Sequence, residues 1–336
     1  MKYLYAIIIS LIILSSCIST KYVNINVYDP ALITFDSTIV NVIIVDNVPD
    51  SKNQLDSIIN NNWGTEFITL SADSAKWALT KSLAQFMDEE QYFNRVARYR
   101  YVTGRDSTFD KNLPLTKTDI ADICEKTESD ALISLDQIII SPTIEKISDY
   151  PSTINLLEIK TGVLLRTYKA DGTMLMPNIT MIDSLYWEGI ELRNRIIKPL
   201  PDFEEATMEA AVNLADKLVD VYIPHWRETQ RWYYSIGKNA SKAAEQTQWS
   251  EAAVLWNEIF DKEHNNDSRK ARLAFNIALA NECMDDIENA IKWIDIAFYL
   301  IPQHNNTILA DHTTMYRNEL MKRKIDKEKL ANQIGN

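Results

Sequence analysis

The sequence contains few of the residues from which recognisable catalytic and metal sites are built. Its 336 residues include seven glycines, four histidines and three cysteines. The glycines never cluster, so they form no phosphate-cradling loop, and the histidines lack the paired spacing with carboxylates that indicates a metal site. No nucleophile-elbow motif is present either. The sequence therefore predicts a protein that is not an enzyme and that holds no cofactor and no metal.

The chain also has little positive charge and few long apolar runs. Lys and Arg number 35 against 47 Asp and Glu, and the resulting net charge of −12 would repel a nucleic-acid backbone. After the N-terminus, no segment approaches the roughly 18 apolar residues of a membrane-spanning helix. We expect no nucleic-acid partner, and membrane contact through the N-terminus alone.

Two cysteines, Cys124 and Cys283, lie far apart in the sequence after residue 17. They are too few for a disulfide framework, and their spacing does not suggest zinc. Cys124 falls on the apolar face of an expected helix, and Cys283 lies near the end of another. We therefore expect buried structural thiols rather than a nucleophile or a disulfide.

The N-terminus has the pattern of a bacterial signal peptide. Lys2 supplies the positive charge, residues 4–14 supply a short apolar core, and residues 14–17 read Leu-Ser-Ser-Cys. This string resembles the lipobox of bacterial lipoproteins, which implies that residues 1–17 comprise the signal peptide and lipobox and that Cys17 is acylated. The mature chain would then begin at Cys17.

The residues after the expected acylation site bear on location. In Gram-negative lipoproteins, an Asp directly after the acylated cysteine holds the protein at the inner membrane, whereas here that residue is Ile18. Residues 19–21 read Ser-Thr-Lys and lack an acidic cluster that would resemble a surface-export signal. We expect a lipid anchor in the outer membrane with the protein on the periplasmic face.

Residues 18–200 alternate between strand and helix patterns and predict an α/β domain with helices packed on a mixed sheet. Apolar runs and alternation predict strands over 23–27, 39–45, 92–101 and 131–140, followed by a hairpin over 153–168 that turns at residues 160–162. Helices are expected over 71–87 and from a capping box at Thr116 and Asp119. The strings Ser-Asp-Ala-Leu-Ile at 129–133 and Ile-Lys-Thr-Gly-Val at 159–163, together with the element order, resemble the small α/β domain of the curli-secretion lipoprotein and of lipoprotein activators of penicillin-binding proteins.

Four arginines lie on or beside the strand expected over 92–101. They could form an anion site for a cell-wall or lipopolysaccharide group, or they could protect an edge strand from aggregation. The second reading fits better, because one strand projects alternate residues to opposite faces. These residues are Arg95, Arg98, Arg100 and Arg105.

Residues 201–336 predict an all-α domain. Asp202 and Glu205 form a capping box for a first helix that stops before Pro224, and a second helix is expected around the aromatic residues at 226–234. That aromatic cluster could be a sugar platform, but at helical spacing it more often forms an interhelix core. Small and large residues then recur at a spacing that resembles tetratricopeptide repeats: Ala240, Ala252, Trp256, Ile259, Ala278, Ala290, Ile294, Ala297 and Pro302.

Two repeats of this kind would present the inner helix of each pair on a concave face. The candidate binding residues on that face are Tyr234, Ser241, Glu245, Arg272, Phe275, Leu279 and Glu282. Phe275 beside Arg272 offers an exposed aromatic anchor if the face is open. Alternatively, the C-terminal helix expected over 313–330 folds back and buries Phe275. Both alternatives are compatible with the sequence.

The complete layout, from the lipobox through the α/β domain to the helical repeats, resembles a family of lipoproteins from Gram-negative gut bacteria to which no activity is assigned. It favours a membrane-tethered scaffold that binds an envelope protein or peptide through its helical repeats. The competing hypothesis is an envelope hydrolase that acts on glycan or peptide, because an active site assembled from distant residues leaves no local motif.

Overall fold

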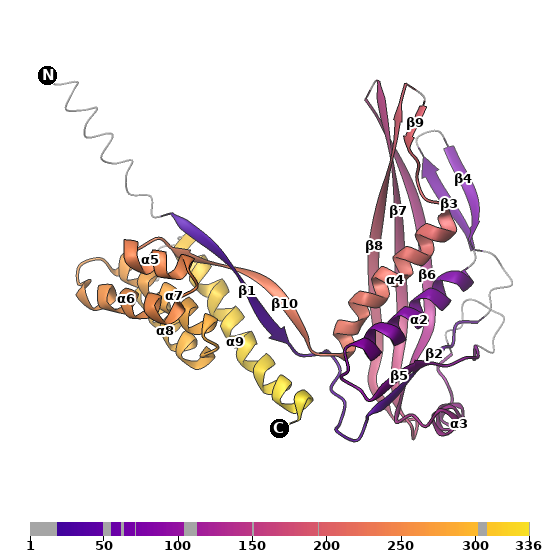
Figure 1. The fold of residues 1–336 in the computed structure, drawn as a ribbon, viewed down its shortest axis with the longest axis horizontal. Helices are drawn as coiled ribbons and strands as arrows, with labels where there is room; N and C mark the ends of the chain where they lie inside the picture. Colours follow the sequence, from indigo (N-terminus) through magenta and orange to yellow (C-terminus); the bar gives the residue numbers. More distant parts are fainter. Residues whose placement is uncertain are drawn as a thin grey trace. The chain divides into compact units, whose positions relative to one another are not determined.

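A computed structural model of the protein describes residues 19–49, 55–61, 64–70, 72–103, 113–149, 151–193, 195–301 and 308–335. These residues form two compact units (Figure 1). The sheet unit comprises the described residues between 31 and 224, and the helical unit combines residues 19–30 with the described residues between 225 and 334. Among the described residues, no helix combines the length and the apolar character needed to cross a bilayer. The predicted fold class, a mixed-sheet α/β domain followed by helices, is confirmed.

The sheet unit is built on six strands in the order β5-β2-β6-β7-β8-β9. β2 runs parallel to its neighbours β5 and β6, and the remaining pairs are antiparallel. A separate hairpin pairs β3 with β4. The strands are β2 (Asn41–Asp46), β3 (Leu55–Asn61), β4 (Gly64–Leu70), β5 (Arg95–Arg98), β6 (Ala131–Asp149), β7 (Ser152–Lys169), β8 (Met174–Leu192) and β9 (Arg195–Lys198).

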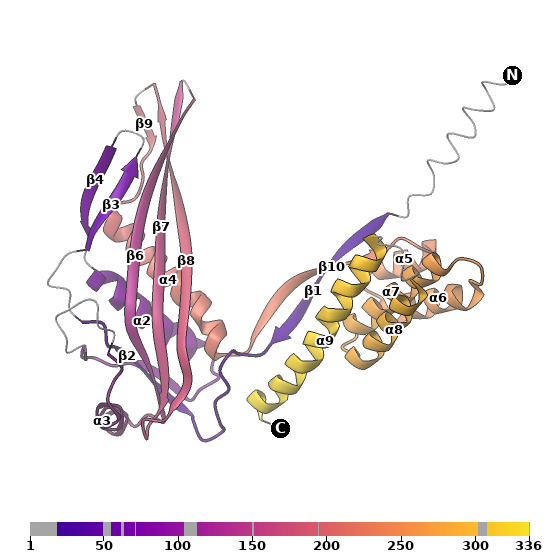
Figure 2. The ribbon, with the colours of Figure 1, turned by 180° about the vertical axis from the view of Figure 1, so that it is seen from behind.

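Two long helices, α2 (Ala72–Glu89) and α4 (Phe203–Tyr222), cover one face of this sheet (Figure 1). Their alanine- and leucine-rich faces are buried against the sheet core. The shorter α3 (Lys117–Thr127) contributes Ile120, Ile123 and Cys124 to a second, smaller core. Seen from behind, the long strands β6, β7 and β8 present the face opposite α2 and α4 (Figure 2).

Helices α3 and α4 begin at the capping residues that the sequence predicts. The Thr116 side chain accepts a hydrogen bond from the backbone N–H of Asp119, and Asp202 does the same for Glu205 at 2.8 Å. Such caps satisfy backbone donors that the first turn of a helix leaves unpaired. The expected helix starts at α3 and α4 are therefore confirmed, with Thr116 and Asp202 as the N-caps.

The expected turn at residues 160–162 is wrong, because β7 runs through it without a break. Gly162 pairs with Ile139 on one side and with Ile182 on the other. A Cβ atom at Gly162 would lie 3.4 Å from the Cγ1 atom of Ile182, an ordinary van der Waals contact, and the backbone here is that of a regular strand rather than of a turn. The chain instead reverses around Pro151 and at Ala170–Gly172.

The helical unit contains five helices and one two-stranded ribbon among its described residues. The ribbon pairs β1 (Thr20–Asp29) with β10 (His225–Tyr234) in antiparallel register, from Thr20 opposite Tyr234 to Asp29 opposite His225. The helices are α5 (Lys238–Glu245), α6 (Trp249–Lys262), α7 (Asp267–Cys283), α8 (Ile287–Leu300) and α9 (Ile308–Ile334).

The helix expected around residues 226–234 is therefore wrong: this stretch is strand β10. Aromatic residues and threonine favour strands as well as interhelix cores, and the long-range pairing with β1 decides between them. The expected domain boundary at residues 200 and 201 also differs from the structure. Helix α4 packs with the sheet, while β1 joins the helical unit because its backbone pairs with β10.

The two ends of the sheet unit lie side by side. The backbone N–H of Ile33 donates a hydrogen bond of 3.0 Å to the carbonyl oxygen of Val221. This bond joins the chain entering the unit to the end of α4. In the sequence, the sheet unit is thus inserted between β1 and β10. Its own contacts hold its first and last residues close together.

Candidate binding groove

The concave face predicted from the repeat spacing is filled by the protein itself. Phe275 is 1% exposed. The centre of its ring lies 4.8 Å from the centre of the Tyr316 ring on α9 and 5.8 Å from that of the Trp232 ring on β10. Leu279 and Tyr234 are also buried. Of the two alternatives that the sequence leaves open, the structure shows the covered face.

The remaining predicted contact residues serve the same packing. The Arg272 guanidinium lies 5.5 Å from the centre of the Tyr234 ring, and the Tyr234 hydroxyl lies 3.3 Å from Nδ1 of His312 on α9. Burial raises the pKa of Tyr234 to about 12, so this hydroxyl stays neutral at physiological pH. Ser241 is buried, and Glu245 pairs with Lys21 of β1. These residues assemble the unit and leave no open concave face.

Glu282, the last predicted contact residue, is the centre of a buried ionic cluster. Its carboxylate accepts hydrogen bonds from Arg231 Nη2 at 3.1 Å, Arg323 Nη1 at 2.8 Å and the Tyr316 hydroxyl at 2.7 Å. Arg231 also contacts Glu319 at 3.1 Å. Burial opposes the charge on Arg231, but attraction to Glu282 outweighs it and raises the pKa of Arg231. The cluster fastens β10, α7 and α9 together.

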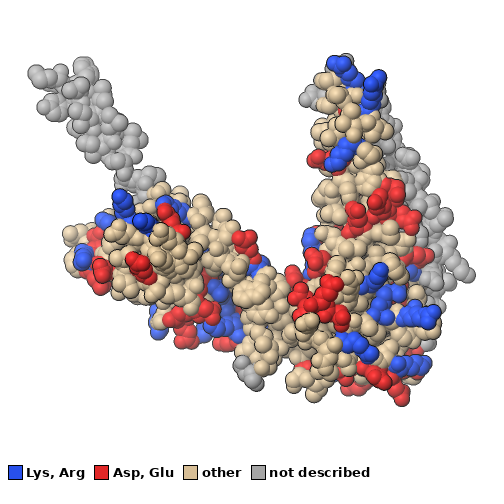
Figure 3. Space-filling model, in the orientation of Figure 1, with Lys and Arg blue, Asp and Glu red and all other residues tan. Residues whose placement is uncertain are grey.

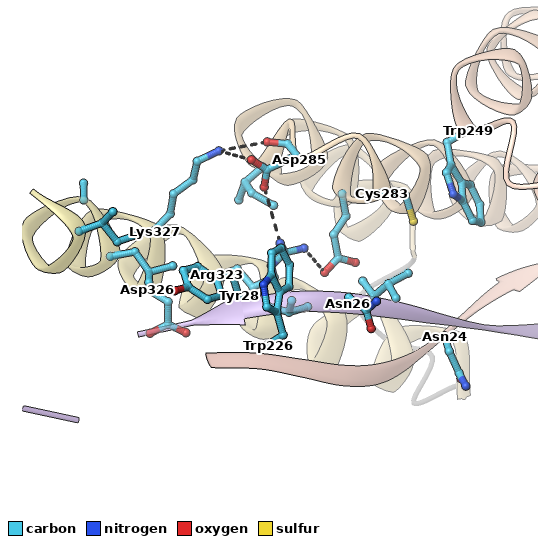
Figure 4. Close-up of a pocket in the computed structure, with 17 residues that line it drawn as sticks. Asn24, Asn26, Tyr28, Trp226, Trp249, Cys283, Asp285, Arg323, Asp326 and Lys327 are labelled. Carbon is cyan, nitrogen blue, oxygen red and sulfur yellow. Dashed lines mark hydrogen bonds and ion pairs between the residues drawn. The ribbon is translucent and has the colours of Figure 1, made fainter. Parts of the chain in front are cut away.

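An open groove lies beside this cluster, within the helical unit (Figure 4). Its volume is about 570 Å³, within the usual range of ligand sites. It is bounded by β1, by the turn between α7 and α8, and by the C-terminal half of α9. The lining residues are Asn24, Ile25, Asn26, Val27, Tyr28, Trp226, Trp249, Glu282, Cys283, Asp285, Ile287, Arg323, Asp326, Lys327, Leu330, Ala331 and Ile334.

The groove follows an edge of β1 and not one of its faces. Five consecutive β1 residues line it, whereas β10 contributes Trp226. Successive residues of a strand project to opposite faces, so a run of consecutive residues indicates that the backbone edge borders the space. Among the described residues, β10 is the single strand paired with β1. In an antiparallel pair, alternate residues point their N–H and C=O groups away from the partner strand, so β1 offers backbone donors and acceptors to the groove.

Aromatic and charged side chains flank this backbone edge. Trp226 is 70% exposed, and its ring lies 4.8 Å from that of Tyr28. Across the groove, Lys327 Nζ lies 2.7 Å from Asp285 Oδ2, as the dashed lines in Figure 4 show. Asp326 is half-buried, and no hydrogen-bond or ion-pair partner of its carboxylate is found in the described part of the chain. Burial raises the pKa of Asp326, with Asp29 and Glu319 adding to the rise.

Burial keeps both cysteines of the described residues in the neutral thiol form. Burial raises the pKa of the Cys283 thiol to about 12, so it carries almost no thiolate at neutral pH. Burial likewise raises the pKa of Cys124 to about 11. Both cysteines are free thiols, as expected from the sequence. The described residues contain no group of three His, Cys, Asp or Glu side chains placed to hold a metal ion.

The arginines near residues 95–100 lie on or just after the edge strand β5. Arg95 donates to the carbonyl oxygens of Thr127 and Glu128 at the end of α3, and Arg98 Nε donates to Thr80 Oγ1 at 2.7 Å. Two of the arginines therefore anchor their own unit. Arg105 and the expected acylation site Cys17 lie outside the described residues.

Sequence reasoning misses the groove. Asn24, Asn26 and Trp226 come from strands that meet through long-range pairing, and Asp326 comes from the last helix. Alternation in residues 23–27 predicts β1 correctly, but nothing in it identifies β10 as the partner. The one signal in the sequence is the aromatic residues and threonine at 226–234, which favour a strand as well as an interhelix core.

Two family models and one solved structure match parts of the chain. The crystal structure of lipoprotein GNA1162 from Neisseria meningitidis matches at 11% identity and a TM-score of 0.18, over 53% of this chain and 99% of that one. A TM-score this low supports no inference. No curated protein matches the chain in sequence. A model described as a domain of unknown function (DUF6340) matches residues 238–322. A second model, also described as a domain of unknown function (DUF8603), matches residues 39–234, more than half of the chain, and the protein therefore belongs to the DUF8603 family.

Proposed function

We propose that the protein is a lipoprotein tethered to the outer membrane, on its periplasmic face, and that it acts as a non-catalytic module binding an extended segment of an envelope protein or peptide. The signal-peptide pattern and the Leu-Ser-Ser-Cys string at residues 14–17 support the tether. The single observation that carries the binding role is the open groove along the free edge of β1.

An extended segment fits this groove by strand addition. Its backbone would pair with the outward N–H and C=O groups of β1 and extend the ribbon to three strands. Trp226 offers an exposed aromatic surface to an apolar side chain of the segment. The Asp326 carboxylate would pair with a Lys or Arg of the segment and so be relieved of the cost of its partial burial.

Site-specific crosslinking tests this role in the envelope. A photoreactive amino acid at Asn26, on the groove side of β1, is expected to capture one polypeptide partner, identified by mass spectrometry of the adduct. Trp226→Ala and Asp326→Asn should each reduce the yield of that adduct at least about tenfold, since either removes a central contact. The same reagent at the exposed Lys242 of α5 is the control and should not yield this adduct.

Asp326→Asn separates lost binding from lost folding. Because the pKa of Asp326 is raised in the folded protein, its ionised form is disfavoured there, and stability falls as pH rises through that pKa. The Asn variant should therefore unfold at a slightly higher urea concentration than the unchanged protein at pH 7, and at the same concentration at pH 3.

Identical adducts from Asn26 and Lys242, or unchanged capture in Asp326→Asn, would contradict the proposal that the groove binds the partner. Turnover of glycan or peptide by the purified chain, abolished by one carboxylate or serine change, would contradict the non-catalytic role.

A further inference from the structure

The end of the sheet farthest from α3 exposes a row of aliphatic side chains. Ile147 of β6 pairs with Ile154 of β7, which pairs with Ile190 of β8. Paired residues of neighbouring strands project to the same face of a sheet, so these isoleucines form a continuous row. Leu192, two residues further along β8, lies on the same face and is exposed. This is the face opposite α2 and α4 (Figure 2).

The short edge strand β9 exposes two further aliphatic side chains at the same end of the sheet. Ile196 pairs with Glu191, so it projects to the face opposite the isoleucine row, and the aliphatic side chains lie on both faces of this end. Ile196 is 69% exposed and its neighbour Ile197 is 62% exposed. Two adjacent isoleucines at this exposure are unusual on a strand that reaches the edge of a sheet, where charges normally prevent aggregation. An exposed apolar patch of this kind marks an interaction surface.

Positive charge surrounds the exposed isoleucines. Arg193, Arg195 and Lys198 lie within six residues of one another, and Figure 3 shows Lys and Arg gathered at this end of the sheet unit. No ion pair of these three side chains is found among the described residues, in a chain whose net charge is −12. Glu191, which lies among them, accepts a hydrogen bond from Asn155 at 2.9 Å.

Acidic residues mark the inner limit of this surface. Glu145 and Glu188 both pair with Leu156, two residues inward from the isoleucine row, or about 7 Å along the strands. The cationic and aliphatic side chains therefore occupy a shallow zone at the end of the sheet, in which Glu191 and, beyond Ile147 on β6, Asp149 are the acidic residues. We name this zone the distal tip: Ile147, Ile154, Ile190, Leu192, Arg193, Arg195, Ile196, Ile197 and Lys198.

We propose that the distal tip is a peripheral membrane site that inserts into an anionic phospholipid surface. The aliphatic side chains would enter the boundary between headgroups and acyl chains, which is about as deep as this zone. The three cations would contact lipid phosphates, while Glu145 and Glu188 stay in the water outside. Charge complementarity selects an anionic surface over a neutral one, and the protein's overall negative charge confines the attraction to this end. This contact needs neither the groove nor the acyl chain.

Vesicle flotation of non-acylated residues 18–336 tests this site. The protein should float with vesicles of equal parts phosphatidylglycerol and phosphatidylcholine, and remain unbound with phosphatidylcholine alone. Replacing Arg193, Arg195 and Lys198 together by Gln should weaken partition about 100-fold, since each cation near an anionic surface contributes about fivefold. Ile196→Ser with Ile197→Ser should also weaken partition at least about tenfold.

Matched variants keep the test specific. Lys238, Lys242 and Lys322, all exposed in the helical unit, are replaced together by Gln to remove the same charge without touching the tip. Ile182→Ser with Ile308→Ser removes two aliphatic side chains that are equally exposed elsewhere. Both controls should float like the unchanged protein, and unchanged thermal unfolding shows that each variant is folded.

Three results would overturn the membrane site. One is equal flotation with neutral and anionic vesicles, and another is full flotation of the tip variants. The third is a dimer in sedimentation, without vesicles, that Ile196→Ser with Ile197→Ser dissociates, because the tip would then be an interface between copies of the chain.

Discussion

Phe275 joins three elements of the helical unit through aromatic contacts. Its ring packs against Trp232 and Tyr234 of β10 and Tyr316 of α9. A side chain in this position contributes through buried area and ring geometry, and none of its surface remains for a partner. Its sequence neighbourhood gives no sign of this, because the covering strand and helix come from distant parts of the chain.

Phe275→Ala should therefore behave as a core mutation. We expect a loss of about 3 to 5 kcal/mol in the free energy of unfolding, since the deletion leaves a cavity between β10, α7 and α9. Urea unfolding of the purified chain measures it. Val254→Ala, at a side chain that is 57% exposed, is the matched control and should change stability by less than about 0.5 kcal/mol. Equal unfolding midpoints for the two variants would show that Phe275 is not covered.

At the scale of elements, the ionic cluster around Glu282 decides how the ribbon and the helices are joined. Glu282→Gln leaves the buried Arg231 and the largely buried Arg323 beside a neutral amide, and removing one partner of a buried ion cluster typically costs about 3 to 5 kcal/mol. We expect a loss of that size in urea unfolding. Glu288→Gln is the control, because Glu288 is largely exposed and lies 3.7 Å from Lys324. A Glu282→Gln variant as stable as this control would mean that the cluster does not hold the elements together.

The predictability of the elements follows the range of the interactions that form them. Helices α3 and α4 begin at the N-caps Thr116 and Asp202, and their buried stripes are visible in the sequence, because both signals lie within a few residues. Strand β10 depends on β1, a partner nearly 200 residues away, so its aromatic residues are equally compatible with a helix. Gly162 predicts a turn locally, whereas pairing on both sides keeps it in a strand.

The candidate site is less predictable than the fold. The repeat spacing correctly identifies small residues that are buried where helices pair, such as Ala252 and Ala290. It does not reveal that α9 and β10 occupy the concave face, since a spacing pattern describes helix pairs and says nothing of what covers them. The groove is created by that covering, and so it follows from tertiary structure alone.

At the scale of the whole molecule, the tether is the property most open to test. Cys17→Ala should abolish incorporation of labelled fatty acid into the protein and shift it from the detergent phase to the aqueous phase on phase separation. The acyl chains are the expected membrane anchor, and they cannot be attached without the thiol. Cys283→Ala should retain the label. Incorporation that persists in Cys17→Ala would exclude residues 14–17 as the acylation site.

The hydrogen bond between Ile33 and Val221 has a consequence for the order of folding. A chain that emerges N-terminus first exposes β1 long before β10 exists, and closing so long a loop is entropically costly. The sheet unit removes that cost when it folds, because its own contacts bring its entry and exit together and leave Asp29 close to His225. Pairing of β1 with β10 then becomes a local zipping step from that end. The helical unit, although it begins first in the sequence, is in this topology the last to be completed.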